Sequence, residues 1–594
     1  MLKALTSKVT GGIFRRRMDI NRSYLLELDS QSLLQNFYLE AGIIMPDLQV
    51  VPDPEKTKLH WGWESPTCQL RGHFLGHWLS AAARLIASEK DMELKHKLDH
   101  IVSELARCQQ RNGGEWVGSI PEKYLDWMCS PEYIWSPQYT MHNTVMGLVD
   151  ACRFAGNEQA LEVVSRLADW YLKWSERMPD GIYKGEQGGM LEEWAELYAL
   201  TGCEKYKVLI DRYKDNYLFT KLENEPDALT DDHANASIPI SHGAARLYEV
   251  TNDEMWRRRT ELFWQHAVTM RGMYATTGQN AGEFWIPPHK QHTYLCDRDQ
   301  EFCTVYNMVR TADYLFRWTG DVKYADYIER ALYNGFLSQQ NQFTGMPAYF
   351  LPLGMGSRKK WGSKRHDFWC CHGTMVQSQT LYPELALYKD EAGKALTVAQ
   401  YIPVETETAI SGSLVRISLT SDMSDHNNQV FFAEHTSSEK SMWSFKLTVA
   451  CDKPTEFTMA LRIPCWAKDH AILCGGEPIS EKPEDGFVRI TRLWSEEIVE
   501  IRFKNELYEE SLPDALEVAA ILDGPVVLAG LTEQDCGLQG ELKDCLAPNT
   551  EHLYSYTPWK QSSFITRGQP VNFRFIPLYE VTDEVYTVYY SRKK

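Results

Sequence analysis

Apolar residues recur at intervals of three and four positions through much of the chain between about residue 23 and residue 388. The segments with this spacing include HFLGHWLSAAARLIAS, MELKHKLDHIVSELARCQQ, HNTVMGLVDACRFAG, NEQALEVVSRLADWYLKWSERM and EEWAELYALTG. Such spacing places the apolar side chains on one face of an α-helix, and about ten to twelve helices are predicted. Several follow one another as helix, short loop and helix, which suits a toroid of helical hairpins.

The pattern changes after about residue 395, where apolar and polar residues alternate. LTVAQYIPVETETAI, LVRISL, SFKLTVAC, TEFTMALRIP, GFVRITRLW and IVEIRF are rich in Val, Ile and Thr. This alternation indicates half-buried antiparallel strands. A second strand-rich stretch runs from ALEVAAILDGPVVLAGL to VYTVYY. The sequence therefore predicts an N-terminal segment (1–22), a helical domain (23–394), a β-sandwich domain (395–510) and a second β-rich region (511–594).

The formal net charge of −19 argues against nucleic acid or an anionic membrane as the main partner. No run approaches the roughly 20 apolar residues of a membrane helix. The basic residues Arg15, Arg16 and Arg17 precede no apolar stretch of secretory length, although they leave a mitochondrial transit peptide open. We therefore expect a cytoplasmic protein whose 14 cysteines are mostly reduced thiols. The sequence leaves the oligomeric state open.

Aromatic residues make up 12% of the chain, including 19 Trp and 30 Tyr. Such side chains stack on sugar rings in binding clefts, but they more often fill hydrophobic cores. The aromatic content is therefore compatible with a carbohydrate-binding protein and does not identify one.

Two segments, EFCTVYN and FWCCHGT, concentrate the metal-binding side chains. The first places Glu301 two residues before Cys303, and the second places Cys370 directly before Cys371. Three thiols and one carboxylate make a tetrahedral zinc set. The spacing matches no zinc knuckle or finger, so unpaired cysteines that pack as small core hydrophobes remain an alternative.

A second candidate metal site consists of His73 and His77, four residues apart on one helix face. The thiol-rich set is the better zinc site of the two, because three thiolates bind this ion more tightly than two imidazoles.

The same segments carry a resemblance to a known family. The E-x-C string and the adjacent cysteine pair, together with GQNAGEFW upstream, resemble glycoside hydrolase family 127, a group of β-L-arabinofuranosidases. RGHFLGHWLSAAARL, HNTVMGLVDA, EQGGMLEEWAELY, DDHANASIPISHGAARLYEVT and LRIPCWAK stand in the order that the family shows. The resemblance covers nearly the whole chain. It implies a mainly α catalytic (α/α)6 barrel followed by all-β sandwich domains.

The resemblance also implies roles for individual residues. Zn2+ would be held by Glu301, Cys303, Cys370 and Cys371, with Cys370 as the nucleophile and Glu283 as the general acid/base. A cysteine attacks as the thiolate, and binding to zinc removes the thiol proton. Glu283 would serve as the acid if burial raised its pKa from about 4.3 toward 6. The sugar would leave with retained configuration after a two-step displacement.

Substrate contacts are expected from histidines and amides in the family-like strings. His142 and His242 are the first candidates, with Gln138, Glu186 and Tyr349 behind them, since a furanose offers hydroxyls and a ring oxygen to such partners. His77, His233 and His372 stand in similar strings. Any one of these histidines, taken alone, is more often a structural residue with its hydrogen bonds satisfied.

The sequence after the cysteine pair, His372-Gly373-Thr374, departs from the proline-rich turn of the family pattern and leaves the exact sugar open. The leading hypothesis is a retaining exo-glycoside hydrolase that releases an L-arabinofuranose-type sugar from a small oligosaccharide or glycoside. One alternative is a helical-barrel lyase or two-carboxylate hydrolase acting on plant-derived oligosaccharides. Another is a non-catalytic carbohydrate-binding protein with a structural zinc. Cys370 distinguishes them, because only the first hypothesis requires its sulfur for turnover.

Overall fold

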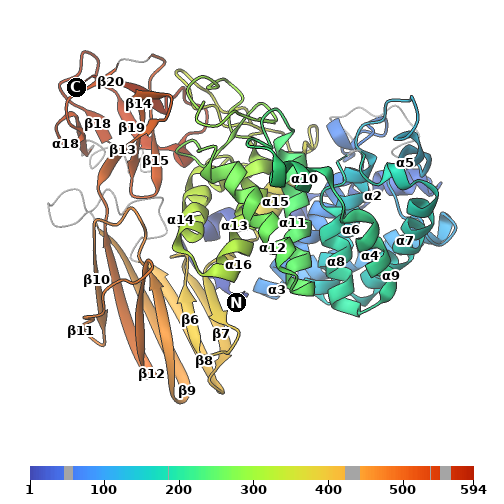
Figure 1. Ribbon diagram of the computed structural model, residues 1–594, viewed down its shortest axis with the longest axis horizontal. Helices are drawn as coiled ribbons and strands as arrows, with labels where there is room; N and C mark the ends of the chain where they lie inside the picture. The colour runs from blue at the N-terminus through green and yellow to red at the C-terminus, as the bar shows by residue number, and fades with distance from the viewer. Residues whose placement is uncertain (46–57, 185, 422–441, 535–536, 549–563, 594) are drawn as a thin grey trace.

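The computed structural model describes residues 1–45, 58–184, 186–421, 442–534, 537–548 and 564–593. A helical domain occupies one side of the molecule, and two sheet-rich domains occupy the other (Figure 1). No helix in these described ranges is both long enough and apolar enough to cross a membrane.

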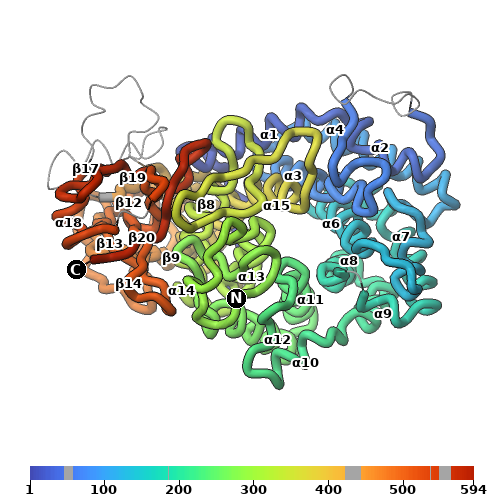
Figure 2. Tube along the Cα trace, turned by 90° about the horizontal axis from the view of Figure 1, so that it is seen from above, coloured from blue at the N-terminus to red at the C-terminus, as the bar shows by residue number. Residues whose placement is uncertain are grey.

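The helical domain is an (α/α)6 barrel with six inner helices. Each inner helix contacts the next, and the last returns to the first. The inner helices are α3 (His73–Glu89), α6 (Pro137–Ala155), α8 (Met190–Thr201), α11 (Ala234–Thr251), α13 (Phe302–Thr319) and α15 (Cys370–Ser378). Figure 2 shows how these helices enclose the centre of the domain. The predicted toroid of helical hairpins is thereby confirmed.

Outer helices pair with the inner ring and cover its surface. They are α1 (Gly12–Glu27), α2 (Ser30–Glu40), α4 (Met92–Arg111), α7 (Glu158–Arg177), α9 (Glu204–Tyr213), α12 (Glu254–Trp264) and α14 (Val322–Ala331). Shorter elements of the domain are α5 (Lys123–Trp127), α10 (Tyr217–Asn224), α16 (Tyr382–Leu385), η2 (Gly62–Glu64), η3 (Pro179–Gly181), η4 (Gln265–Thr269), η5 (Leu332–Phe336) and the hairpin β3 (Asn280–Ala281)–β4 (Phe284–Trp285).

Inner and outer helices differ in burial as their positions require. In α7 the buried residues follow the three and four spacing, because one face packs on the barrel and the other meets solvent. Helix α3 is buried nearly all round. It approaches α6 so closely that a Cβ on Gly76 would lie 1.9 Å from the Asn143 carbonyl oxygen. Glycine at position 76 therefore sets the distance between two inner helices.

The middle domain is built from two long antiparallel strands, β9 (Met442–Arg462) and β12 (Phe487–Lys504), with shorter strands on either side. One path of the sheet runs β1-β5-β6-β9-β12-β10-β11, and β2, β7 and β8 join it at β9. The shorter strands are β1 (Leu2–Ala4), β2 (Lys8–Val9), β5 (Leu387–Asp390), β6 (Ala395–Val398), β7 (Val404–Ile410), β8 (Ser413–Ser421), β10 (Asp469–Cys474) and β11 (Glu477–Pro478).

The first 22 residues do not form the separate segment that was expected. Strand β1 pairs with β5 and strand β2 pairs with β7, so residues 2–9 complete the middle domain. Helix α1 begins at Gly12 and belongs to the barrel. Short strands with only two or three residues carry too little alternation to be recognised in the sequence.

The C-terminal domain is a sheet with the order β16-β20-β14-β15-β19-β18-β17, to which β13 adds beside β14. Its elements are β13 (Leu507–Leu512), β14 (Ala515–Asp523), β15 (Val526–Gly530), β16 (Leu538–Gln539), α18 (Leu542–Cys545), β17 (Leu546–Pro548), β18 (Phe564–Thr566), β19 (Arg574–Pro577), η8 (Leu578–Glu580) and β20 (Tyr589–Lys593). Leu522 and Val588 share a hydrophobic cluster with Ile286 and Leu353 of the barrel loops. This domain therefore supports the loops around the barrel mouth.

Candidate active site

Four metal-binding side chains meet at the starts of two neighbouring inner helices. Glu301 and Cys303 lie at the beginning of α13, and Cys370 and Cys371 are the first two residues of α15. One ligand atom from each lies within 4.8 Å of all the others. Cys303 Sγ is 3.4 Å from Cys371 Sγ, and Cys370 Sγ is 3.6 Å from Glu301 Oε1. Closure of the circle of inner helices places α15 beside α13 and therefore brings together two segments that are nearly 70 residues apart in the sequence.

These residues suit a zinc ion. All four side chains are buried, and Glu301 Oε2 has no hydrogen-bond partner in the structure. A buried carboxylate oxygen without a partner is costly, and a cation would satisfy it. Three sulfurs and one oxygen form a donor set that zinc accepts. Both helix N-termini also favour negative charge on the thiolates.

Glu283 lies on the tip of the β3–β4 hairpin beside Gly282, whose φ of +56° favours glycine. The backbone carbonyl of Glu283 accepts the amide hydrogen of Ala234 at 2.8 Å, which fastens the hairpin to the start of α11. Trp285 is buried, and its indole N–H donates to the Ser237 hydroxyl at 2.8 Å. The hairpin therefore holds the Glu283 carboxylate at a fixed place on the barrel.

Tyr349 stands between the carboxylate and the sulfur cluster. Its hydroxyl donates to Glu283 Oε1 at 2.5 Å and lies 3.5 Å from Cys370 Sγ. The amide of Phe302 donates to the Tyr349 carbonyl at 3.0 Å, which ties this segment to the start of α13. The three residues form one chain of contacts from the acid to the sulfur.

The hydrogen bonds within this chain set the protonation of its members. Burial raises the pKa of the Cys370 thiol, but contacts from Cys303, Cys371 and Tyr349 outweigh burial and lower that pKa well below its ordinary value. The pKa values of Cys303 and Cys371 rise, chiefly through burial. Hydrogen bonds from its neighbours therefore stabilise a thiolate at Cys370.

Glu283 differs from the expectation that burial raises its pKa toward 6. The contact with His233 lowers the pKa of the Glu283 carboxyl, burial raises it, and the Tyr349 hydroxyl lowers it again, so that the net shift is downward. His233 Nε2 lies 3.7 Å from Glu283 Oε2. The expectation considered burial alone, and partners on other segments cannot be recognised from GEFW.

A central pocket lies in the ring and meets the sulfur cluster at Thr374, whose hydroxyl is 3.1 Å from Cys303 Sγ. Residues of five inner helices and of the loop before α8 line this pocket: His77, Tyr139, His142, Asn143, Met146, Glu186, Gly188, Gly189, Asn235, Ala236, Pro239, Tyr306, Asn307, Arg310, Thr374 and Gln377. The arrangement offers hydroxyls, amides and imidazoles to a small polar ligand.

Two of the expected substrate contacts, His142 and Glu186, line this pocket. His142 Nε2 is buried without a hydrogen-bond partner, and it lies 3.9 Å from Glu193 Oε1. Its ring occupies the space that a side chain on Gly189 would fill. Glu186 accepts from the Ser136 hydroxyl at 2.9 Å, and burial raises the pKa of its carboxyl.

His242 and Gln138 are placed differently from the expectation that they touch the sugar. Both are wholly buried, and neither lines the central pocket. The Gln138 amide donates to three backbone carbonyls, including that of Gly181 at 2.9 Å, and its oxygen accepts from the Tyr213 hydroxyl. Gln138 therefore holds the loop before α8.

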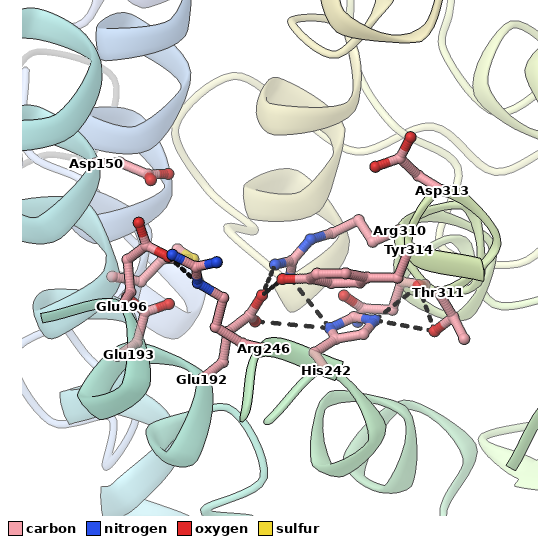
Figure 3. Close-up of polar contacts among 12 residues, drawn as sticks. Asp150, Glu192, Glu193, Glu196, His242, Arg246, Arg310, Thr311, Asp313 and Tyr314 are labelled. Carbon is pink, nitrogen blue, oxygen red and sulfur yellow. Dashed lines mark hydrogen bonds and ion pairs between the residues drawn. The ribbon is translucent and has the colours of Figure 1, made fainter. Parts of the chain in front are cut away.

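His242 holds Arg310, which does line the pocket. Arg310 donates to His242 Nδ1 at 3.2 Å and to Glu192 Oε1 at 2.6 Å (Figure 3). His242 Nε2 lies 2.9 Å from the Asn307 carbonyl oxygen, so this nitrogen carries the ring proton. Burial and the Arg310 charge lower the pKa of His242 to about 3. The neutral imidazole of His242 therefore accepts a hydrogen bond from the Arg310 guanidinium and fixes its orientation.

The alternative metal pair, His73 and His77, is engaged in hydrogen bonds. His73 Nε2 lies 2.8 Å from the Phe368 carbonyl oxygen, and His77 Nδ1 lies 2.6 Å from Gln377 Oε1. The Tyr139 hydroxyl is 3.3 Å and 3.5 Å from their remaining nitrogens. Burial lowers the pKa of His73 to about 3 and that of His77 to about 4. In the described part of the chain, the one cluster of three or more metal-binding groups is the cysteine set.

The glycine in the string after the cysteine pair has a steric reason. A Cβ on Gly373 would lie 2.1 Å from Cδ2 of His77. Gly373 therefore allows the His77 ring to pack on α15 at the pocket wall.

The sequence reasoning missed Tyr139 and Arg310 as pocket residues. Their signal was present as polar side chains on otherwise apolar helix faces, three residues before HNTVMGLVDA for Tyr139 and three residues after EFCTVYN for Arg310. Such a signal does not separate a pocket-lining residue from a buried ion pair.

Known proteins agree with this architecture. Residues 7–384 match the family model described as Beta-L-arabinofuranosidase, GH127 catalytic domain, and residues 395–504 match the GH127 middle domain. A non-reducing end β-L-arabinofuranosidase of Bifidobacterium longum is 26% identical over 472 residues, which are 69% of this chain and 67% of that protein.

Solved structures show the same fold. A GH127 β-L-arabinofuranosidase from Geobacillus stearothermophilus T6 superposes with a TM-score of 0.73 at 18% identity, covering 99% of this chain and 100% of the other. A second GH127 β-arabinofuranosidase gives a TM-score of 0.73 at 16% identity, with coverages of 100% and 98%.

Proposed function

This chain belongs to glycoside hydrolase family 127, and we propose that it releases β-L-arabinofuranose from the non-reducing end of small glycosides. In the proposed mechanism the anomeric configuration is retained, Cys370 is the nucleophile and Glu283 is the general acid/base. The observation that carries this proposal is the chain of contacts from Glu283 through Tyr349 to Cys370 beside the central pocket. The similarity to the non-reducing end β-L-arabinofuranosidase of Bifidobacterium longum supports the choice of sugar.

In the first step, the Cys370 sulfur attacks the anomeric carbon as the bond to the leaving oxygen breaks. Glu283 gives its proton to that oxygen, and a thioglycosyl enzyme forms on Cys370. In the second step Glu283, now ionised, removes a proton from water, which displaces the sulfur and restores the thiolate. Two displacements at one carbon retain the configuration.

A zinc ion held by Glu301, Cys303, Cys370 and Cys371 would keep the sulfurs ionised and lower the basicity of the leaving thiolate. The unpartnered Glu301 oxygen and the closely grouped sulfurs support this assignment. The contacts of Tyr349 and His233 favour the ionised form of Glu283, which the second step requires. The first step requires the protonated form, so the complex must take up a proton at this carboxyl.

A panel of p-nitrophenyl furanosides and pyranosides, assayed with and without a chelator, tests the proposal. We expect turnover of the β-L-arabinofuranoside that falls when the chelator removes the metal. Proton NMR of the first product should show retained anomeric configuration. Inversion, or preference for a pyranoside, would reject the proposed activity.

A further inference from the structure

Four buried carboxyl groups lie close together on the inner helices α6 and α8 (Figure 3). They belong to Asp150, Glu192, Glu193 and Glu196. Like charges at such short range repel one another, and burial strengthens the repulsion because the surrounding dielectric constant is low. An ionised carboxylate is therefore stable here only where a basic partner compensates it.

Glu193 differs from the other three in its partners. Each of the others has an arginine: Glu192 Oε1 pairs with Arg310 at 2.6 Å, Glu196 Oε1 with Arg153 at 3.1 Å, and Asp150 Oδ2 with Arg84 at 3.8 Å. In the described part of the chain, neither a lysine nor an arginine pairs with Glu193, whose contact is with the His142 ring. The arrangement of charges therefore favours the neutral acid at this one position.

The surroundings of Glu193 act in the same direction. Burial is the largest of the causes that raise the pKa of its carboxyl well above the ordinary value. The neighbouring carboxylates of Glu192, Asp150 and Glu196 raise this pKa further. Arg310 lowers it, but the net shift is upward. A group with such a pKa keeps its proton at neutral pH.

His142 turns its buried nitrogen toward this acid. Its Nε2 has no hydrogen-bond partner and lies 3.9 Å from Glu193 Oε1. That gap is longer than a formed hydrogen bond, and such contacts commonly tighten when a ligand binds. Burial lowers the pKa of His142 to about 3, so the ring is neutral and only one of its nitrogens carries a hydrogen. A hydrogen donated by Glu193 would satisfy Nε2 and leave the ring hydrogen on Nδ1.

We propose that Glu193 is a positioning residue that acts as a neutral acid. It donates its hydrogen to Nε2 of His142, and His142, which lines the central pocket, then offers Nδ1–H as a donor to an oxygen of the sugar. Glu192, one residue earlier on α8, stays ionised and holds Arg310 at the same pocket. The inference rests on the proposed function in taking the ligand to be a sugar, whereas the hydrogen bond between Glu193 and His142 does not depend on it.

NMR of the ring nitrogens tests the position of the hydrogen directly. Enzyme labelled with ¹⁵N in its histidine rings distinguishes the two neutral forms from the charged one, and the His142 signal is the one that disappears in His142→Asn. The wild type and Glu193→Gln should both carry the hydrogen on Nδ1 at neutral pH, because a glutamine amide can also donate to Nε2. Glu193→Met has no donor, so the hydrogen should shift toward Nε2. A charged ring in the wild type, or a hydrogen on Nε2, would overturn the assignment.

Kinetics measures what the contact contributes to binding. Glu193→Met should raise KM for p-nitrophenyl β-L-arabinofuranoside by about tenfold and keep kcat within about twofold, because a contact made equally in the ground state and the transition state affects KM alone. Glu193→Gln should keep KM within about threefold of the wild-type value. Equal losses in the two variants, or no loss in either, would contradict a role for the donated hydrogen.

Glu192→Gln is the matched comparison, since it makes the same change one residue earlier on α8. It leaves the buried Arg310 guanidinium without its carboxylate and should therefore lower the midpoint of denaturant unfolding. Glu193→Gln replaces one neutral group by another and should leave that midpoint unchanged. A similar decrease in both variants would show that Glu193 is ionised and would reject the proposal.

These measurements separate the inference from the proposed function. If the wild-type enzyme cleaves no L-arabinofuranoside, the proposed activity fails, while the His142 signal and the two unfolding midpoints still decide the state of Glu193. If Glu193→Met does not fold, the ring hydrogen of the wild type and the two glutamine variants decide it. A hydrogen on Nδ1 together with an unchanged midpoint in Glu193→Gln supports the neutral acid, and any other combination rejects it.

Discussion

The hydroxyl of Tyr349 donates its single proton to Oε1 of Glu283 at 2.5 Å while it lies 3.5 Å from Sγ of Cys370. A phenol has one hydrogen to donate, so it can stabilise an ionised carboxylate or an ionised sulfur, but not both fully. When the hydrogen points to Glu283, the carboxylate is favoured. When it turns to Cys370, the thiolate is favoured and Glu283 is free to take up a proton. Tyr349 therefore links the charge of the acid/base to the charge of the nucleophile.

Tyr349→Phe should raise the pKa of Glu283, because one of the hydrogen bonds that lower it is lost. The first step needs the protonated acid, so kcat/KM falls as the pH rises through this pKa. We therefore expect the alkaline limb of the pH profile to move to higher pH, with a lower maximum. Tyr327→Phe is the control, because that buried hydroxyl contacts Gln279. An alkaline limb that is unchanged in Tyr349→Phe, or that moves to lower pH, would contradict the proposed link between the charges of Glu283 and Cys370.

Glu283→Gln should slow hydrolysis of glycosides with poor leaving groups by about 100-fold or more, because the leaving oxygen loses its proton donor. Activated aryl glycosides need no proton and should keep their first step. A burst of p-nitrophenol followed by slow release of sugar would reveal the impaired second step. Equal losses on alkyl and aryl glycosides, with the fold intact by circular dichroism, would assign the acid to another residue.

Cys370 should carry the sugar during turnover. A haloacetamide analogue of the correct furanose should label this sulfur alone among the 14 cysteines, and an acid-quenched slow substrate should leave a sugar mass on the peptide containing FWCCHGT. Cys370→Ala should lower kcat by a factor on the order of 10⁴ or more. Cys371 is the internal control, since it shares the cluster but its sulfur lies 3.8 Å from the Tyr349 carbonyl oxygen, whereas that of Cys370 lies 3.5 Å from the Tyr349 hydroxyl. An adduct on Glu283 or Glu301 would replace the cysteine mechanism with a carboxylate one.

The purified protein should contain about one zinc per chain, as measured by elemental analysis. Changing Cys303, Cys370 and Cys371 together to Ser should remove it, because hydroxyls ligate zinc far more weakly than thiolates. The matched control changes Cys203, Cys451 and Cys465 to Ser, which lie outside the cluster. Full metal content in the first variant would show that the ion is held elsewhere.

Gly76→Ala should destabilise the barrel, because its new methyl group would lie 1.9 Å from a backbone oxygen that cannot rotate away. We expect a loss of about 1–3 kcal/mol or more in the free energy of unfolding. Gly354→Ala is the control, since nothing lies within 4 Å of a Cβ there. Denaturant titration would measure the free energy of unfolding of both variants. If Gly76→Ala were as stable as Gly354→Ala, then α3 and α6 can move apart to accept the methyl group.

The helical ring could be predicted because many of its helices show the three and four spacing of apolar residues, as in α4 and α7. The middle domain was predicted equally well from the alternation in β9 and β12. The pairing of β1 with β5 could not be predicted. Three residues are too few to show an alternation of apolar and polar side chains, and their partners lie almost 390 positions away. Register between distant short strands depends on the assembled barrel.

Residue type indicated the cysteine cluster and the family resemblance implied its four members, which the structure brings together because both segments begin inner helices. His242 and Gln138 show where residue type misleads. A histidine or glutamine that hydrogen-bonds buried backbone looks the same in sequence as one that binds a sugar. The pKa of Glu283 likewise depends on Tyr349 and His233, which reach it from other segments.

The pairing of residues 2–4 with residues 388–390 has a consequence for biosynthesis. The first strand leaves the ribosome long before its partner exists. At about 5–20 residues per second, roughly 20–80 s pass before the partner is made. During that time the ring of helices can begin to assemble, while the middle sheet lacks one edge. The order of translation therefore favours a barrel that forms first and a sheet that is completed afterwards by a strand made much earlier.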